Sequence, residues 1–241
     1  MKLPILPLSL ALVLVCAFSA GAQKRKPIRD IRKAAVVIDE NLSVLRAKPS
    51  LFAPSIQRMR RGRRVQIMGS ADADGVKFYK VSASRRRFGW VQSDAVFART
   101  QASDEERFAK LVQAASGFDQ IELAARFLEL YPSSSFRPAI LLLVGDLLED
   151  AASKLSRDAN SRLSRREMTA SGAPLHSFYL NFNMLDRYRK LGAVFLFDST
   201  RRVFHYNGAT WAEIIRKHPA SVEAKEAQRR LDSLKEKLKL D

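Results

Sequence analysis

The chain has 241 residues, and its 42 Lys and Arg against 25 Asp and Glu give a formal net charge of +17. Cys16 is its one cysteine, so the chain can form no internal disulfide and its fold must rest on a hydrophobic core. The length fits one large domain or two smaller ones. A strongly basic charge favours anionic partners, although a solvated surface that only keeps the protein soluble would have the same composition.

The N-terminal residues have the pattern of a secretory signal peptide over residues 1–22. One Lys precedes an apolar run, and small residues end the segment as Ala20-Gly21-Ala22. We therefore predict cleavage before Gln23 and export to the periplasm or the outside of the cell, with no membrane span in the mature chain. An uncleaved anchor is one alternative. A lipid anchor on Cys16 is another, because LVLVC resembles a lipobox, although Val15 stands where Gly, Ala or Ser is preferred.

The basic charge is concentrated in the first part of the predicted mature chain. Lys and Arg exceed Asp and Glu by 13 between Gln23 and Thr100, but by only 3 from there to the C-terminus. Such a shift in composition indicates two domains. We predict the first domain over residues 34–98 and the second over residues 103–241.

Short apolar runs between residues 34 and 98 alternate with polar residues at a period of two. The runs AAVVI, SVLR, RVQIM, VKFYKV and RFGWV are separated by turn-forming stretches such as AKPS, RRGR and SADADG. This spacing is typical of a small all-β barrel. Within RVQIM, we expect Val65 and Ile67 to face the core, whereas Arg64 and Gln66 face the other way.

The same runs resemble the bacterial Src-homology-3-like domain of exported and cell-wall proteins. The matching stretches are LRAKPS (Leu45–Ser50), Arg61-Gly62, VQI (Val65–Ile67), FYKV (Phe78–Val81) and GWV (Gly89–Val91). Lys48 replaces a Gly of the family pattern, and Phe78 replaces a Trp. The resemblance implies a barrel that binds peptidoglycan or another wall component, or one that serves only as a spacer.

Arginines and two aromatic residues of the predicted barrel are the candidate ligand-binding residues. Guanidinium groups would attract an anionic envelope polymer, and exposed rings would give it a stacking surface. The candidates are Arg58, Arg60, Arg61, Arg63, Arg64, Tyr79, Arg85, Arg86, Arg87 and Trp90.

Two roles are open to Trp90. In a strand of period two it shares one face with Phe88, whereas Gly89 and Val91 share the other. A large indole can still close one end of a small barrel. We predict this packing role, rather than a binding platform beside the Arg85–Arg87 run, because aromatic side chains are more often buried.

The second domain is predicted to be helical and repetitive. Ser103 and Glu106 have capping-box spacing at its start. Two pairs of amphipathic helices follow, each joined by a Pro corner, at Tyr131-Pro132-Ser133-Ser134 and at His218-Pro219-Ala220-Ser221. Helical hairpins stack to bury a shared face, and these corners resemble those of degenerate tetratricopeptide-like repeats. The resemblance implies a groove for a protein partner.

The interval between the two helical pairs is rich in aromatic residues. Phe178, Phe182 and Leu185 would lie on one face of a helix, and the runs AVFLF and RVFHYNG after Gly192 predict a β-hairpin. We expect these aromatics to fill the core between the helical units. The expected fold class is therefore mixed, with a small all-β barrel and a mainly α-helical domain that carries a hairpin insert.

The sequence contains no recognisable catalytic motif. His176, His205 and His218 are far apart and lack metal-ligand spacing, and neither a phosphate loop nor a nucleophile elbow occurs. We expect no enzyme, no metal and no cofactor, and export argues against a nucleic acid partner. The favoured interpretation is a non-catalytic binding or scaffold protein of the bacterial cell envelope. The alternative is a wall-remodelling enzyme or its accessory subunit, using carboxylates such as Glu149 and Asp150.

Overall fold

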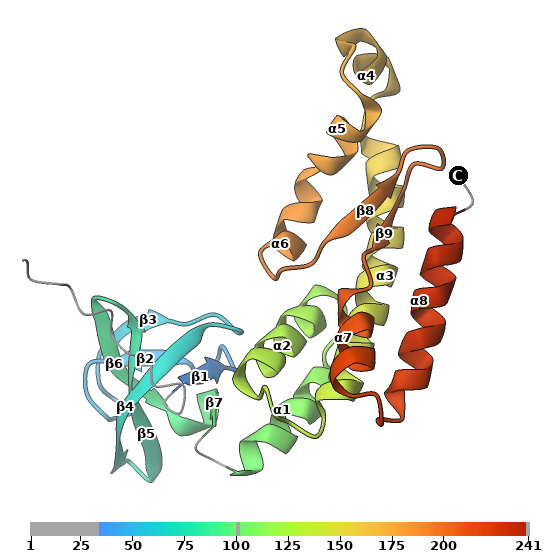
Figure 1. Ribbon diagram of the computed structural model, residues 1–241. Helices are drawn as coiled ribbons and strands as arrows, with labels where there is room; N and C mark the ends of the chain where they lie inside the picture. The colour runs from blue at the N-terminus through green and yellow to red at the C-terminus, as the bar shows by residue number, and fades with distance from the viewer. Residues whose placement is uncertain (1–33, 100–101, 240–241) are drawn as a thin grey trace, which may run out of the picture. The chain divides into compact units, whose positions relative to one another are not determined.

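The computed structural model describes residues 34–99 and 102–239 as one seven-stranded sheet, one two-stranded hairpin and eight α-helices (Figure 1). The fold is thus mixed, as predicted. The predicted signal segment, with Cys16 and the cleavage site before Gln23, lies outside the described residues. Among the helices of the described part, none combines the length and the apolar character that a membrane crossing needs.

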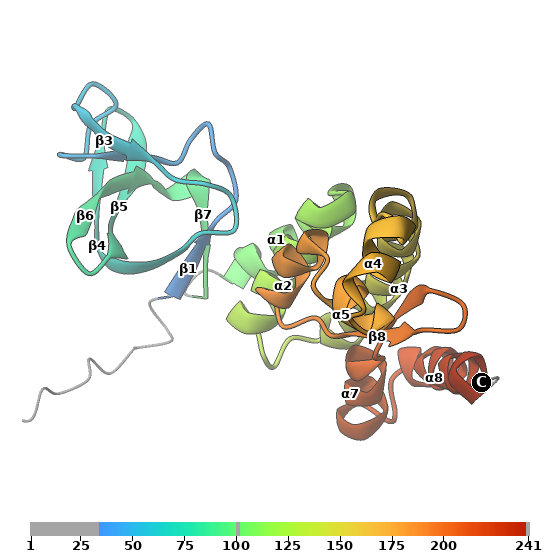
Figure 2. The same cartoon turned by 90° about the horizontal axis from the view of Figure 1, so that it is seen from above.

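The seven-stranded sheet is antiparallel throughout, with the strand order β3-β2-β6-β5-β4-β1-β7. Seen from above, it is curled rather than flat (Figure 2). Its strands confirm the β structure predicted for residues 34–98. They are β1 (Ala34–Val37), β2 (Val44–Arg46), β3 (Ser55–Arg58), β4 (Arg64–Ala73), β5 (Val76–Ser84), β6 (Arg87–Gln92) and β7 (Val96–Ala98).

Alternation along the strands separates a buried face from an outer face. On β5, Tyr79 and Val81 are buried, whereas Lys80 between them is exposed. On β4, Val65 is buried and Arg64 is exposed, as predicted. Because successive side chains of a strand point to opposite faces, the buried residues of different strands meet in one apolar cluster.

The rest of the described chain is helical apart from one hairpin. This hairpin pairs β8 (Phe195–Asp198) with β9 (Val203–Tyr206) and confirms the predicted insert. The predicted aromatic helix is interrupted, because the backbone at Phe182 is extended. The helices are α1 (Ala102–Ala114), α2 (Gly117–Leu130), α3 (Arg137–Arg162), α4 (Arg165–Ser171), α5 (Leu175–Leu180), α6 (Asp186–Arg189), α7 (Ala209–Lys217) and α8 (Glu223–Lys239).

The two Pro corners have the same backbone hydrogen bonds. In the first, the Ser134 amide donates to the Tyr131 carbonyl oxygen at 3.3 Å. In the second, the Ser221 amide donates to the His218 carbonyl oxygen at 3.0 Å. In each corner, the donor serine lies three residues after the residue that accepts. The matching geometry supports a repeated helical hairpin, formed first by α2 with α3 and again by α7 with α8.

Helix packing joins the two hairpins. Besides α2, α3 packs against α7, and α7 in turn packs against α8. At Gly145 of α3 the indole of α7 approaches closely, since an added Cβ would lie 2.2 Å from Nε1 of Trp211. Because glycine has no side chain, it permits this approach.

The sheet and the first helices share apolar packing. Phe97 of β7 contacts Phe108 of α1, with 5.2 Å between the ring centroids, and the apolar cluster of the helices includes Val36 of β1. The buried carboxylate of Asp104 accepts a hydrogen bond from the Ala98 amide at 2.9 Å. Charge and periodicity change at this boundary, but buried packing continues across it.

Candidate binding surface

The structure divides the eight candidate arginines between two places. Four of them contact or lie near the β1–β2 loop and α2, and four gather around the β5–β6 turn. The first group is Arg58, Arg60, Arg61 and Arg64, and the second is Arg63, Arg85, Arg86 and Arg87.

The β3–β4 turn is held against α2. Arg64 forms an ion pair with Glu129, and Nε of Arg126 donates to the Gly62 carbonyl oxygen at 3.0 Å. Gly62 has a φ of +74°, and an added Cβ there would lie 3.0 Å from the Glu122 side chain. Glycine is therefore required both by the backbone conformation and by the close packing. This part of the arginine-rich turn binds the helices of its own chain.

Two further arginines of the first group support the loop between β1 and β2. Nη1 of Arg58 donates to the carbonyl oxygens of Glu40 and Asn41 at 2.8 and 2.9 Å. Nε of Arg61 donates to the Ile38 carbonyl oxygen at 3.1 Å. Both guanidinium groups are thus engaged in fixing the backbone of a neighbouring loop.

Arg60 lines a cleft of about 360 Å³ between the β3–β4 turn and α2. Arg61 lines it as well, but so do the acidic residues Glu40, Asp119 and Glu122. Since carboxylates outnumber the cations here, the cleft does not favour an anionic ligand.

The arginines around the β5–β6 turn keep their charge uncompensated. Nη2 of Arg63 donates to the Ala83 carbonyl oxygen at 2.9 Å, and Nη1 of Arg87 donates to Oε1 of Gln57 at 2.5 Å. Both acceptors are neutral, so neither hydrogen bond cancels the charge. The Arg85–Arg86 pair is exposed in the turn, without an ion pair or side-chain hydrogen bond to any described residue. These four residues form the arginine end of the sheet.

The two candidate aromatic residues lie on opposite faces. Tyr79 is 7% exposed within the apolar cluster of the sheet, so the prediction is corrected: its buried ring offers no stacking surface. Trp90 is half-buried on the outer face and belongs to neither apolar cluster, so the predicted core role is wrong. The reason is strand alternation: Val91 points into the apolar cluster, so Trp90 and Phe88, which is 46% exposed, point to the opposite face.

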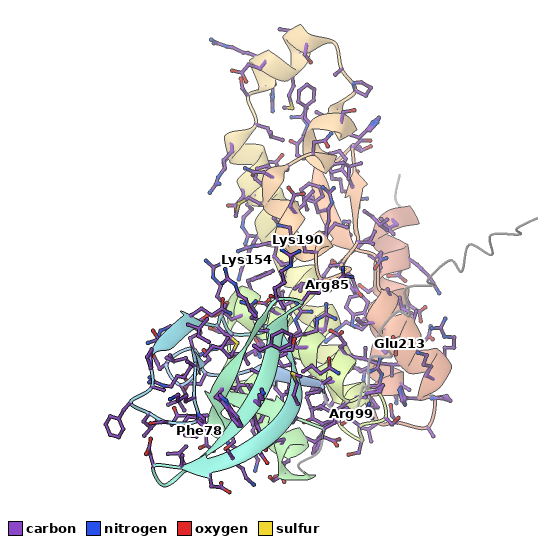
Figure 3. All side chains as sticks on the ribbon, turned by 90° about the vertical axis from the view of Figure 1, so that its left-hand side faces the viewer. Phe78, Arg85, Arg99, Lys154, Lys190 and Glu213 are labelled. Carbon is purple, nitrogen blue, oxygen red and sulfur yellow. The ribbon has the colours of Figure 1, made fainter. Side chains whose placement is uncertain are left out.

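Phe78, which stands where the family pattern has a Trp, pairs with Gln92 of β6 and so shares the face of Trp90. It is fully buried, and it lies toward the opposite end of the sheet from Arg85 (Figure 3). The exchange of Trp for Phe at this position therefore removes no donor from an exposed surface.

The loop before β3 is fixed by hydrogen bonds at both of its sides. The Asp74 carboxylate accepts from the Ser50 hydroxyl and the Leu51 amide, both at 2.7 Å. These two bonds lower the pKa of Asp74. Nη1 of Arg46 donates to the Ala53 carbonyl oxygen at 2.7 Å. The loop that contains Lys48 consequently has a defined conformation, which hydrogen bonds to Arg46 and Asp74 stabilise.

A groove of about 590 Å³ is lined mainly by the interval between the two helical pairs, where the sequence predicted none. Leu163, Phe178 and Phe182 give it an apolar lining, and Arg162 and Asn181 add polar groups. The sequence did show the aromatic residues, but we assigned all of them to the core. Phe182 is buried as expected, whereas Phe178 is only partly buried. The extended backbone at Phe182, which lines the groove, has no local sequence pattern.

Glu149 joins three elements that are distant in the sequence. Its carboxylate accepts from the Tyr206 amide at 2.9 Å and from Nζ of Lys237 at 3.0 Å, and it lies 3.2 Å from Nδ1 of His205. Burial raises the pKa of Glu149, but these hydrogen bonds outweigh that effect and hold the pKa below its usual value. The carboxylate connects α3, β9 and α8, a role that the sequence does not indicate.

The histidines and acidic residues form no evident metal centre in the described segments 34–99 and 102–239, where no three His, Cys, Asp or Glu side chains gather. Comparison with known proteins finds no match among family models, curated proteins or solved structures. The Src-homology-3-like and tetratricopeptide-like resemblances therefore rest on the sequence motifs, and the function must be argued from the surfaces described above.

Proposed function

We propose that this protein is a non-catalytic binding or scaffold protein of the bacterial cell envelope. Its sheet, as a bacterial Src-homology-3-like barrel, binds peptidoglycan or another anionic envelope polymer. Its helices, as degenerate tetratricopeptide-like hairpins, bind a protein partner. The export that this role requires is the one expected from the N-terminal sequence pattern.

The arginine end of the sheet carries the proposal. Arg63 and Arg87 donate to neutral acceptors, and the exposed Arg85–Arg86 pair has no acidic partner in the described residues. A cluster of uncompensated cations concentrates anions near it, over a screening length of about 8 Å at physiological salt. The first group of arginines, in contrast, is used largely within the chain.

The helical part supports the second half of the proposal. Stacked helical hairpins bury their shared face and leave an outer surface available for a partner. The groove lined by Leu163, Phe178 and Phe182 offers apolar contacts of the kind that anchor a protein interface.

Cosedimentation with purified peptidoglycan tests the polymer-binding role. We expect the wild-type protein to bind and the double variant Arg85→Glu, Arg86→Glu to lose binding, and we expect wild-type binding to weaken steeply as salt rises. The matched control changes Arg165 and Arg166 to Glu. This second pair is also adjacent and exposed, lies on α4, and gives the same change in net charge.

The outcomes separate the competing functions. Equal loss of binding in both double variants would mean that only net charge matters, and unchanged binding in both would remove the arginine end from the proposal. Soluble wall fragments released by the wild-type protein would favour the wall-remodelling alternative. Substituting Arg60, Arg61 and Arg64 is a poor test, because Arg64 and its turn also hold α2.

A further inference from the structure

Two aromatic rings lie side by side on the outer face of β6. Phe88 is 46% exposed, and Trp90 is half-buried. Side chains two positions apart on a strand share a face, at a separation of roughly 6.6 Å along it. Neither ring forms an aromatic pair or a cation–π contact with a described residue. The exposed parts of both rings are therefore not used in ring contacts within the described chain.

Cationic side chains flank Trp90 on both neighbouring strands. The sheet register pairs Trp90 with Lys80 of β5 and with Arg46 of β2. Residues paired in this way have Cβ atoms about 5 Å apart on one face. Lys80 is exposed and has no carboxylate partner among the described residues, and Arg46 donates to the neutral Ala53 carbonyl oxygen. Their charge is thus available beside the indole.

Neutral polar groups lie on the same face. Ser82 is paired with Phe88, and Gln92 is two positions beyond Trp90 on β6. A hydroxyl and an amide can both donate and accept hydrogen bonds. The face therefore combines ring surfaces, cations and neutral hydrogen-bonding groups.

We propose that the Trp90 face, defined as Arg46, Lys80, Phe88 and Trp90, binds an acidic polysaccharide. This inference rests on the proposed function and names the chemical class of its polymer. The apolar C–H surfaces of sugar rings pack on the two aromatic rings, the cations pair with carboxylates of the chain, and Ser82 and Gln92 hydrogen-bond sugar hydroxyls. The β5–β6 turn, with Arg85 and Arg86, extends the cationic surface along the hairpin.

Single-stranded nucleic acid is the other polymer that combines rings with regular negative charge. The expected export of the chain disfavours it, and the face offers neutral hydrogen-bonding groups suited to sugar hydroxyls. A nucleic acid probe therefore belongs in the test.

The test compares four polymers by titration: alginate as a polyuronate, dextran as a neutral polysaccharide, inorganic polyphosphate as an anion without sugar rings, and poly(dT). We expect the wild-type protein to bind alginate, with weaker binding of the other three. The double variant Phe88→Ala, Trp90→Ala should lose alginate affinity by about tenfold or more, as buried aromatic anchors do, while its polyphosphate affinity changes by less than about twofold. Trp90→Phe should restore part of the alginate affinity. Thermal unfolding of each variant verifies the fold.

Each outcome decides the inference. Unchanged alginate binding in the double variant, with loss in Arg85→Glu, Arg86→Glu, would leave the proposed function intact and overturn the polysaccharide site. Equal binding of dextran, or poly(dT) binding that depends equally on the two rings, would also overturn it. If the wild-type protein does not bind alginate, the polysaccharide site is overturned, whereas the proposed function stands or falls with the peptidoglycan cosedimentation.

Discussion

A single buried carboxylate links the sheet to the first helix. Asp104 is 1% exposed, and besides the Ala98 amide it faces Nη1 of Arg107 at 3.3 Å. Burial raises the pKa of Asp104 above its ordinary value, and the contacts with Ala98 and Arg107 only partly offset this. The ionised carboxylate therefore reduces stability at neutral pH, while its oxygen still satisfies a buried amide.

Replacing Asp104 with Asn should make that electrostatic cost visible. A folded-state pKa above the unfolded one means that the native protein binds the proton more tightly, so wild-type stability falls as pH rises above the carboxyl range near about pH 4. We expect Asp104→Asn to gain stability relative to the wild type between about pH 3 and 7, in urea unfolding at each pH. Asp104→Ala, which leaves the Ala98 amide unpaired, should be less stable than the Asn variant by about 1–3 kcal/mol. A pH-independent difference would contradict this account.

Strand alternation predicts which residues share a face, but it leaves open which face is covered. The period of two correctly predicted that Trp90 shares a face with Phe88, and that Gly89 shares the other face with Val91. The interior position of Tyr79 also follows from that period once Val81 is known to be buried. The burial of a given face depends on how the sheet curls and on the loops above it, and these are set by contacts between distant residues.

The helical hairpins were the most predictable elements, because their information is local. Apolar spacing and the two Pro corners predicted α2, α3, α7 and α8, and the corners have matching hydrogen bonds. The interruption at Phe182 was not predictable, since an apolar face at helical spacing continues through it. The junction at Glu149 was missed for a similar reason: its partners His205 and Lys237 lie on other elements, far along the sequence.

The contact between the two hairpins depends on one glycine, and Gly145→Ala should disrupt it. An added Cβ would lie 2.2 Å from Nε1 of the buried Trp211, which is too close without movement of α3 or α7. Overpacking of this kind costs about 1–3 kcal/mol, against a gain of about 1 kcal/mol from the higher helix propensity of Ala. We expect a net loss of stability in urea unfolding, and partial recovery when Trp211→Phe removes the indole N–H.

Gly69→Ala is the matched control for that prediction. Gly69 lies in β4, and no atom outside its chain neighbours is within 4 Å of an added Cβ. This variant should unfold at a urea concentration close to that of the wild type. If Gly145→Ala were equally stable, the two helices would have to separate without cost, and the proposed close packing would be wrong.

At the scale of the whole molecule, the structure neutralises part of the basic charge of the first part and leaves the rest without acidic partners among the described residues. The sequence predicted a ligand-binding role for all eight of its candidate arginines. In the structure, Arg64 is paired with Glu129 of α2 and the Gly62 carbonyl oxygen accepts from Arg126 of α2, so the β3–β4 turn holds this helix. The arginine end, around the β5–β6 turn, remains the surface available for an anionic polymer. Composition revealed the excess charge, but only the positions of the acidic residues on α2 showed where it is neutralised.

The connection between sheet and helices leads to a prediction for the isolated helical part. The sequence predicts that residues 103–241 fold alone, because charge, periodicity and capping change at their start. We expect this fragment to give a helical circular dichroism spectrum but to unfold at a lower urea concentration than the full chain. It lacks Phe97, which packs on Phe108, and the Ala98 carbonyl oxygen, to which the Tyr131 hydroxyl donates at 3.4 Å.

Phe97→Ala in the full chain provides the comparison. Removing the buried ring should cost about 3–5 kcal/mol, and the fragment, which loses every contact with β1 and β7, should be destabilised at least as much. A disordered fragment would show that sheet and helices form one inseparable core. A fragment as stable as the helices within the full chain would show that Phe97, Val36 and Ala98 do not stabilise the helices. That result would conflict with the burial of Phe97 and Val36 in the apolar cluster of the helices.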